Sequence, residues 1–259
     1  LDITMKPSRG KITFKEGSWF GEISGDSFTG GRGENARFEM RRVELASPTL
    51  GAPPRDTSKA VVLFDGSSLD AWTSGDEKKP EAGWTLLNDG SMMVKPGAGG
   101  IESKQRFKSG RLHIEFRLGL MPSARGQART NSGVFLQGVY EVQVLDSYGL
   151  EGYYDECGAL YKLAAPLVNA CRPPLQWQTY DIDYTAPVVD ASGKVEALGR
   201  MTVYHNGVLV QDDVELKWIT AWKEEEREGP PPTAPGAIKL QDHGNYVQFR
   251  NIWFEPTDQ

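Results

Sequence analysis

Two acids and three amides lie close together in the stretch Asn131–Ser147, NSGVFLQGVYEVQVLDS. Its second half alternates between apolar and polar residues, which predicts a β-strand. Side chains i and i+2 of a strand share a face, so Glu141 and Gln143 are expected opposite the neighbouring valines. Asp146 joins that face only if a bulge adds a residue after Gln143. Such a polar face is typical of the floor of a carbohydrate cleft. The alternative is a half-solvated strand with ordinary outward polar residues.

His243 is the best candidate for proton transfer outside this stretch. It lies in the turn sequence Gln-Asp-His-Gly, and an imidazole with an ordinary pKa near 6.5 accepts and returns a proton at neutral pH. If Glu141 and Asp146 lie close together, the pKa of one rises and that group becomes a proton donor. The alternatives are a solvated turn histidine and two structural carboxylates. The same three residues would also suit Mn, Zn or Ca, but no compact ligand motif is present, so a divalent metal stays an alternative.

Six further side chains are candidates for contacts with a sugar: Asn131, Gln143, Tyr148, Tyr161, Trp177 and Arg250. Each amide offers hydrogen-bond donors and an acceptor, which suits sugar hydroxyls. The aromatic rings could stack on a pyranose ring, although buried aromatic residues more often belong to a core. The arginine could hold a developing oxyanion, and its alternative is an outward position on a surface strand.

Short strands are the elements that must position these side chains. Alternation is clearest in Arg111–Leu118, and Asn206-Gly207 predicts a hairpin between Arg200–Tyr204 and Val208–Gln211. Further strands are expected at Lys11–Phe14, Trp19–Ile23, Ser27–Thr29, Ala36–Val43, Val61–Phe64, Ser91–Val94, Gln176–Tyr184, Ala237–Gln241 and Tyr246–Phe254. No long helix and no fixed repeat is evident. The pattern indicates an all-β fold, an antiparallel β-sandwich or jelly roll.

Three segments differ in composition. Residues 1–45 contain short glycine-punctuated strands with too few apolar residues for an independent core, which predicts a β appendage on the main domain or the end of a larger N-terminal region. Residues 46–59 are rich in Pro, Gly and Ser and predict a linker. Residues 60–259 form the expected jelly-roll domain. Its insertion at 148–174 is long enough to suggest a functional loop, and 218–235, with its charge run, is expected to be solvated.

Composition limits the partners and the location. The net charge is −6 and the pI is near 5.3, so no basic stripe is available for nucleic acid. No apolar run approaches the length of a membrane span. The chain begins at Leu1 without a charged-then-apolar leader, which is expected of a processed product. The oligomeric state is not indicated.

Cys157 and Cys171 are the two cysteines of the chain. A pair of free buried thiols is one interpretation. The other is a disulfide closing the loop between them, which would contribute roughly 3 kcal/mol for a loop of about 15 residues. Both lie in turn-rich sequence beside the expected cleft, so we expect the bridge. It implies an oxidising compartment and therefore a periplasmic or secreted protein.

Five motifs in order, after the opening VVLFDGSSLDAW, resemble one known family: NSGVFLQG, YEVQVLDS, GALYKLAAP, LQDHG and FRNIWFEP. This is the 3-keto-disaccharide hydrolase family, whose members are described as 3-keto-glucoside 1,2-lyase and 3-keto-2-hydroxyglucal hydratase domains. The resemblance covers about Val61 to Pro256 and implies a concanavalin-A-like jelly roll of the lectin and glucanase type. The recurrence of LQDHG in the family favours a functional His243.

The resemblance implies a glycan oxidised at C3 as the substrate. The ketone acidifies the C2 proton, loss of that proton expels the C1 oxygen, and water then adds across the double bond, so the net reaction is hydrolysis. Glu141, Gln143 and Asp146 are also similar to the E-x-D-x-x-E strand of retaining β-glucanases. The amide in the middle and the shorter last acid depart from it, because a retaining mechanism needs carboxyl groups about 5–5.5 Å apart. The alternatives are a conventional two-carboxylate glycoside hydrolase and a non-catalytic carbohydrate-binding module.

Overall fold

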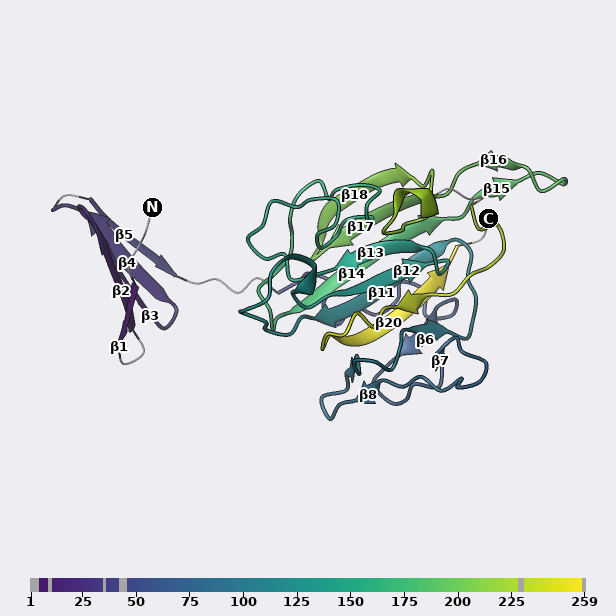
Figure 1. Cartoon of the computed structure of the whole chain (residues 1–259), viewed down its shortest axis with the longest axis horizontal. Helices are drawn as coiled ribbons and strands as arrows, with labels where there is room; N and C mark the ends of the chain where they lie inside the picture. Colours follow the sequence, from purple (N-terminus) through teal and green to yellow (C-terminus); the bar gives the residue numbers. More distant parts are fainter. Residues whose placement is uncertain (1–4, 9–10, 35, 42–45, 228–230, 258–259) are drawn as a thin grey trace. The chain divides into compact units, whose positions relative to one another are not determined.

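The computed structural model of the chain describes residues 5–8, 11–34, 36–41, 46–227 and 231–257. It divides into two compact units, Leu1–Leu45 and Ala46–Gln259, and almost all regular structure in both is β-strand (Figure 1). The two units are described separately below.

The first unit is a single antiparallel sheet in which each strand pairs with the next. Its strands are β1 (Met5–Ser8), β2 (Lys11–Glu16), β3 (Trp19–Ser24), β4 (Ser27–Arg32) and β5 (Ala36–Arg41). The end of the strand expected at 36–43 lies outside the described residues. On one face the rings of Phe14, Phe28 and Phe38 are in contact, with centroids 5.6 and 5.0 Å apart. Gly21 and Gly30 leave room for them, because a Cβ at either position would overlap the ring of Phe14 or Phe38.

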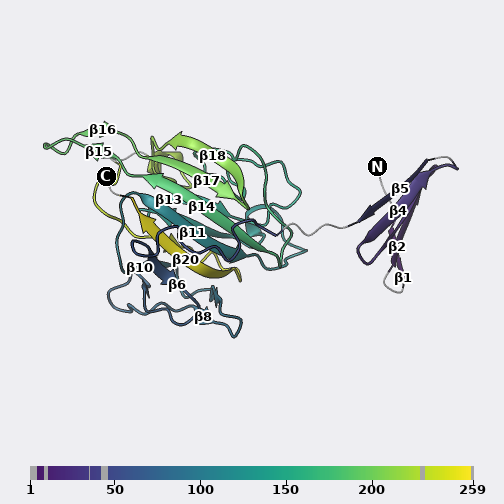
Figure 2. The ribbon, with the colours of Figure 1, turned by 180° about the vertical axis from the view of Figure 1, so that it is seen from behind.

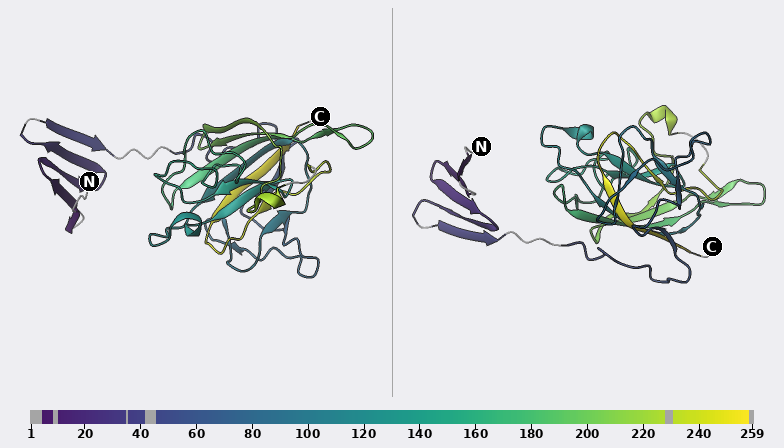
Figure 3. Two further views of the ribbon diagram at one scale, coloured as in Figure 1. Left: turned by 45° about the horizontal axis from the view of Figure 1, so that its top comes forward. Right: turned by 90° about the horizontal axis from the view of Figure 1, so that it is seen from below.

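The second unit is an antiparallel sandwich of two sheets (Figures 2 and 3). The larger sheet has the order β18-β17-β14-β11-β20-β9-β8, with β6 beside β20, and the smaller has the order β13-β12-β19-β10-β7. The larger sheet contains β6 (Val61–Phe64), β8 (Thr85–Leu86), β9 (Met92–Met93), β11 (Gly110–Arg117), β14 (Trp177–Thr185), β17 (Arg200–His205), β18 (Val208–Glu215) and β20 (Gln248–Pro256). The smaller contains β7 (Trp72–Thr73), β10 (Ile101–Ser103), β12 (Ser132–Leu136), β13 (Tyr140–Val144) and β19 (Lys239–Leu240). A separate two-stranded ribbon pairs β15 (Val188–Val189) with β16 (Val195–Ala197).

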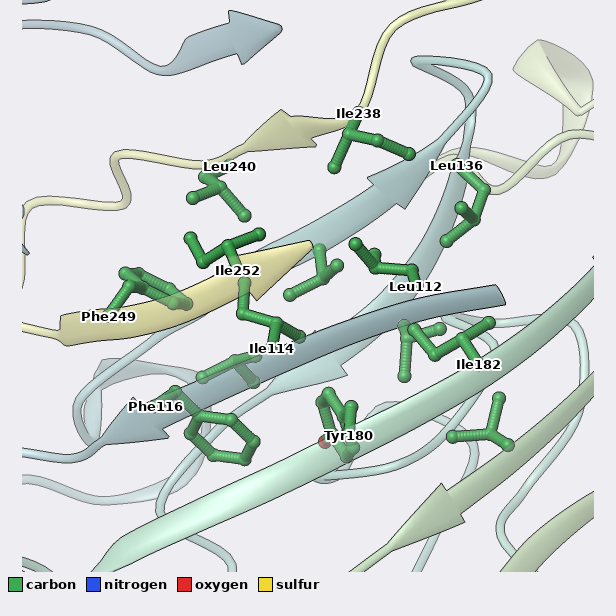
Figure 4. Close-up of a cluster of buried hydrophobic side chains, with 14 of the residues drawn as sticks. Leu112, Ile114, Phe116, Leu136, Tyr180, Ile182, Ile238, Leu240, Phe249 and Ile252 are labelled. Atoms are coloured by element: carbon green, nitrogen blue, oxygen red, sulfur yellow. The ribbon is translucent and has the colours of Figure 1, made fainter. Parts of the chain in front are cut away.

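The hydrophobic core lies between the two sheets (Figure 4). Leu112, Ile114 and Phe116 alternate along β11 and are fully buried. Leu136 and Leu240 meet them from the smaller sheet, also buried. This alternation leaves the polar residues between them on the outer face of each sheet. The all-β jelly-roll prediction is confirmed.

The turns follow the sequence signals. Asn206 and Gly207 have φ of 53° and 77°, the left-handed conformation of a two-residue hairpin turn, and join β17 to β18 as predicted. Two 3₁₀ helices, η1 (Gly126–Ala128) and η2 (Glu224–Glu226), lie in loops outside the sheets (Figure 3). In the described part of the chain no helix has the length and apolar character of a membrane span.

Residues 46–59 belong to the second unit and pack on the outer face of the larger sheet. The Thr49 hydroxyl donates to Asp181 at 2.7 Å, and the Gly51 N–H donates to Glu115. The Ala52 carbonyl accepts from the side chains of Asn251 and Trp253 at 3.2 and 3.0 Å. This face is therefore covered, whereas the outer face of the smaller sheet carries the pocket described next.

Candidate active site

A pocket of about 330 Å³ lies over the outer face of β12 and β13. Its lining comes from these strands, from the chain after β19 and from three loops: Gln127, Asn131, Phe135, Glu141, Gln143, Tyr161, Thr220, Ala221, Trp222, Gln241 and His243. A larger hollow of about 760 Å³ lies on the first unit, but its lining comes from both faces of one thin sheet. The smaller pocket is lined by both a buried acid and a histidine, so it is the candidate active site.

Glu141 is the acid of this pocket. It alternates along β13 with the core residues Val142 and Val144, so its side chain lies on the opposite face, where it is 6% exposed. Burial raises the pKa of Glu141 to about 8, although the Lys239 ammonium group opposes this in part. Glu141 is therefore protonated at neutral pH and can donate a proton. It is the only carboxylic acid lining the pocket among the described residues.

An amide cluster forms the floor beside Glu141. The Gln127 side-chain oxygen accepts from the amides of Asn131 and Gln143, each at 3.0 Å. The Asn131 and Gln241 side-chain oxygens are buried and have no hydrogen-bond partner in the described structure. Both residues line the pocket, so their amide groups are placed to exchange hydrogen bonds with the hydroxyls of a bound sugar.

His243 lines the same pocket from the turn after β19, and its side chain is exposed. The preceding Asp242 fixes the turn, because its carboxylate accepts from the N–H groups of Gly97 and Gly99 at 2.8 and 3.0 Å. It also accepts from the Gly244 N–H at 2.8 Å. The turn that carries the imidazole is thus held beside the pocket, with the side chain open to solvent.

Lys239 is a functional candidate that the sequence interpretation missed. It pairs with Phe135 across β19 and β12, and its ammonium group lies 5.4 Å from that ring. It does not line the pocket, but its positive charge acts on Glu141 and favours the ionised carboxylate. The signal was available, since Lys239 and Gln241 share a face of the strand expected at 237–241.

Asp146 is not part of the pocket. Strand β13 ends at Val144, so no bulge returns Asp146 to the face of Glu141. Its buried carboxylate instead pairs with Arg129 at 2.6 Å. The proposed metal set of Glu141, Asp146 and His243 is therefore not assembled. No cluster of three or more His, Cys, Asp or Glu side chains suited to a metal occurs in the part of the chain that the structure describes.

Three of the expected sugar contacts also lie elsewhere. Arg250 pairs with Glu115 at 2.7 Å on the outer face of the larger sheet, and its guanidinium stacks on Trp177 at 4.0 Å. Tyr148 is 53% exposed in the loop after β13 and does not line the pocket. Asn131, Gln143 and Tyr161 do line it.

The predicted disulfide is not formed. Cys157 and Cys171 are free and buried. The Cys157 sulfur lies 3.1 Å from the Tyr180 hydroxyl, and the Cys171 thiol donates to the Leu145 carbonyl at 3.5 Å. Buried thiols pack as small apolar side chains. Two cysteines in turn-rich sequence are compatible with such free thiols as well as with a disulfide, so the sequence does not distinguish the two. Without the disulfide, the cysteines no longer indicate an oxidising compartment. A periplasmic or secreted location stays a prediction.

The match to a known family covers most of the second unit. The sequence model of a family described as a 3-keto-alpha-glucoside-1,2-lyase-like domain matches residues 59–255. The chain belongs to this family. A search of curated proteins finds no match.

Solved structures agree with membership of the 3-keto-alpha-glucoside-1,2-lyase-like family. A candidate glycosyl hydrolase from Parabacteroides distasonis ATCC 8503 is 39% identical over 77% of this chain and 84% of its own, with a TM-score of 0.68. Two others from the same organism are 17% and 22% identical, with TM-scores of 0.57 and 0.53, covering 78% and 77% of this chain and 95% and 100% of theirs. These two show the fold alone. The chain is a carbohydrate-active enzyme, and its substrate is a glycan.

Proposed function

We propose that this enzyme cleaves 3-keto-glycosides by elimination followed by hydration. The observation that carries the proposal is the buried, protonated Glu141 in a pocket shared with the exposed His243. Family membership supports the same substrate class.

Elimination uses the two groups as base and acid. His243 removes the proton from C2, which the C3 ketone acidifies. The electron pair left on C2 forms the C1–C2 double bond, the bond from C1 to the leaving oxygen breaks, and Glu141 donates its proton to that oxygen. The positive charge of Lys239, which acts on Glu141 from outside the pocket lining, favours the negative charge that develops during this step.

Hydration returns both groups to their starting state. Water adds to C1 and gives a proton to the Glu141 carboxylate, while the His243 imidazolium returns its proton to C2. The sum is hydrolysis to the leaving alcohol and 3-keto-glucose, with no net change in the enzyme.

Conventional hydrolysis by two carboxylates is disfavoured by the pocket itself. Both the retaining and the inverting mechanism need a second carboxyl group across the glycosidic bond. In the described residues Glu141 has no such partner in the pocket, because Asp146 is held by Arg129. A binding module is disfavoured because an acid buried without a partner contributes nothing to sugar recognition that an amide could not.

The test uses 4-nitrophenyl 3-keto-glucoside and follows release of nitrophenol together with the ultraviolet absorption of the enone intermediate. Wild type is expected to release nitrophenol, and His243→Ala and Glu141→Gln are each expected to lose at least about 100-fold in kcat/KM. His113→Gln, outside the pocket, is the control and is expected to retain turnover. Cleavage of the unoxidised glucoside at the same rate, or binding of it without any cleavage of the keto form, would overturn the proposal.

A further inference from the structure

Three aromatic rings gather around one ammonium group beside the pocket. The Lys162 nitrogen lies 4.3 Å from the ring centroid of Tyr154, 5.2 Å from that of Trp222 and 5.7 Å from that of Tyr161. Tyr161 and Trp222 also line the pocket, and Trp222 is 65% exposed. Such an exposed tryptophan at the mouth of a pocket offers a flat apolar face to a ligand.

The segments that carry Tyr161 and Trp222 are hydrogen-bonded to the main chain of Glu141, the proposed proton donor. The Thr220 hydroxyl accepts from the Glu141 N–H at 2.9 Å and donates to the Val139 carbonyl at 2.6 Å. On the other side, the Tyr161 N–H donates to the Glu141 carbonyl at 3.0 Å. Trp222 follows Thr220 by two residues, so these bonds hold the segments that carry both rings beside Glu141.

Lys162 supports the rings and is not itself available to a ligand. Its ammonium group pairs with Asp155 at 2.8 Å, and its side chain is 11% exposed. Its N–H also donates to the Tyr154 carbonyl at 2.7 Å, which fixes the local backbone. Because Asp155 balances this charge, the surface selects for an uncharged ring rather than for an anion.

We propose that Trp222 and Tyr161 form the subsite for the leaving-group half of the substrate. The inference rests on the proposed function, in which Glu141 protonates the oxygen that joins the two halves. The oxygen of the leaving group must therefore lie within hydrogen-bond distance of the Glu141 carboxyl group. The segments that carry the two rings are hydrogen-bonded to the main chain of the same residue. The subsite takes a leaving group with a flat apolar face, which is either a second pyranose ring or an aromatic aglycone.

The test compares three 3-keto-glucosides whose leaving groups are methanol, glucose and 4-nitrophenol. For Trp222→Ala, kcat/KM is expected to fall at least about 10-fold for the two ring leaving groups and less than about twofold for methanol, because stacking on one ring contributes to binding of ring ligands only. Trp222→Phe is expected to recover most of the loss. The control is Trp218→Ala, which removes a 50% exposed tryptophan of the same loop that does not line the pocket. An equal loss for all three substrates, or no loss, would overturn the subsite.

A second readout separates this inference from the proposed function. If wild type cleaves none of the three substrates, the proposed function fails, and unoxidised 4-nitrophenyl glucoside is titrated calorimetrically into wild type and Trp222→Ala. Binding that is weakened at least about 10-fold by the substitution supports the subsite. No binding to wild type, or equal binding to both proteins, overturns it.

Discussion

The carboxyl group of Glu141 lies against Gly133, on the neighbouring strand β12. A Cβ at Gly133 would overlap one oxygen of Glu141 and would come within 2.9 Å of its Cδ atom and 2.8 Å of the Phe135 ring. Glycine at this position is therefore what lets the proton donor lie flat on the sheet. The position belongs to the active site although glycine carries no chemistry of its own.

Gly133→Ala is expected to move the Glu141 carboxyl group and to lower kcat for a 3-keto-glucoside at least about 10-fold, since a misplaced acid loses its alignment with the leaving oxygen. Overpacking is expected to reduce the free energy of unfolding by about 1–3 kcal/mol. Both are measured on the purified variant, by nitrophenol release and by urea unfolding. The control is Gly83→Ala, whose added methyl meets only Ala98, at 3.1 Å, outside the pocket. Full activity of Gly133→Ala would show that Glu141 does not need this position.

Glu141 is expected to weaken the fold as the pH rises. Its pKa is about 8 in the folded chain against an ordinary 4.5, so the unfolded chain releases this proton between those values while the folded chain retains it. Stability therefore falls as pH rises from 4.5 to 8. Glu141→Gln cannot titrate, and its free energy of unfolding is expected to exceed that of wild type by on the order of 1–3 kcal/mol above pH 8, with little difference at pH 4.5.

Urea unfolding of both proteins at pH 4.5, 6.5 and 8.5 measures this difference. Glu151→Gln, which changes an exposed acid, controls for the loss of one charge and is expected to show no such trend. A difference between wild type and Glu141→Gln that does not change with pH would mean that Glu141 ionises normally in the folded enzyme.

The sequence was most informative where residues act through local geometry. Alternation predicted β11, and the same parity rule placed Glu141 and Gln143 on one face opposite the core. Asn206-Gly207 predicted its hairpin because few residue pairs adopt two successive left-handed conformations. The fold class followed from these local rules, since many short strands without helices have few ways to bury a core.

The rest of the site depends on which segments, far apart in the sequence, lie side by side in the fold. Local sequence rules do not predict these contacts. Trp222 directly precedes a charge run in an insertion that was expected to be merely solvated. The hydrogen bonds of the nearby Thr220 hold its segment beside Glu141 and the pocket. Arg250 carries the right chemistry, but its strand belongs to the other sheet, and a positive φ of 44° at Asn251 directs both side chains to Glu115. Asp146 was expected to join the site only through a bulge, which parity does not predict, and strand β13 ends at Val144 without one.

Asp146→Asn separates the structural acid from the catalytic one. It removes the charge partner of Arg129, whose side chain is 23% exposed, and is expected to cost about 1–3 kcal/mol of unfolding free energy. Because Asp146 does not line the pocket, kcat/KM of the folded variant is expected to stay within about threefold of wild type, whereas Glu141→Gln is expected to lose at least about 100-fold. Unfolding and turnover are measured on the same sample. Loss of turnover without loss of stability would restore the two-carboxylate mechanism.

A buried histidine connects residues 46–59 to the larger sheet. His113 Nδ1 lies 2.8 Å from Asp181 and its Nε2 lies 3.7 Å from Glu115. The same two acids accept bonds from Thr49 and from the Gly51 N–H, and Arg111 and Arg250 also face them. Burial by itself would lower the pKa of His113, but the two carboxylates outweigh it and the pKa is raised above 6.5.

The contribution of His113 to stability is therefore complete below pH 6.5 and is lost as pH rises through the raised pKa. His113→Gln is expected to destabilise the fold more at pH 6 than at pH 9.5, because the imidazolium pairs with both acids and the amide pairs with neither as an ion. Hydrogen exchange of residues 46–59 is expected to quicken in the variant at pH 6, since the same acids hold Thr49 and Gly51. The exposed His243→Gln serves as the matched control and should leave exchange in this segment unchanged. A destabilisation by His113→Gln that is equal at both pH values would show that His113 is neutral in the folded enzyme.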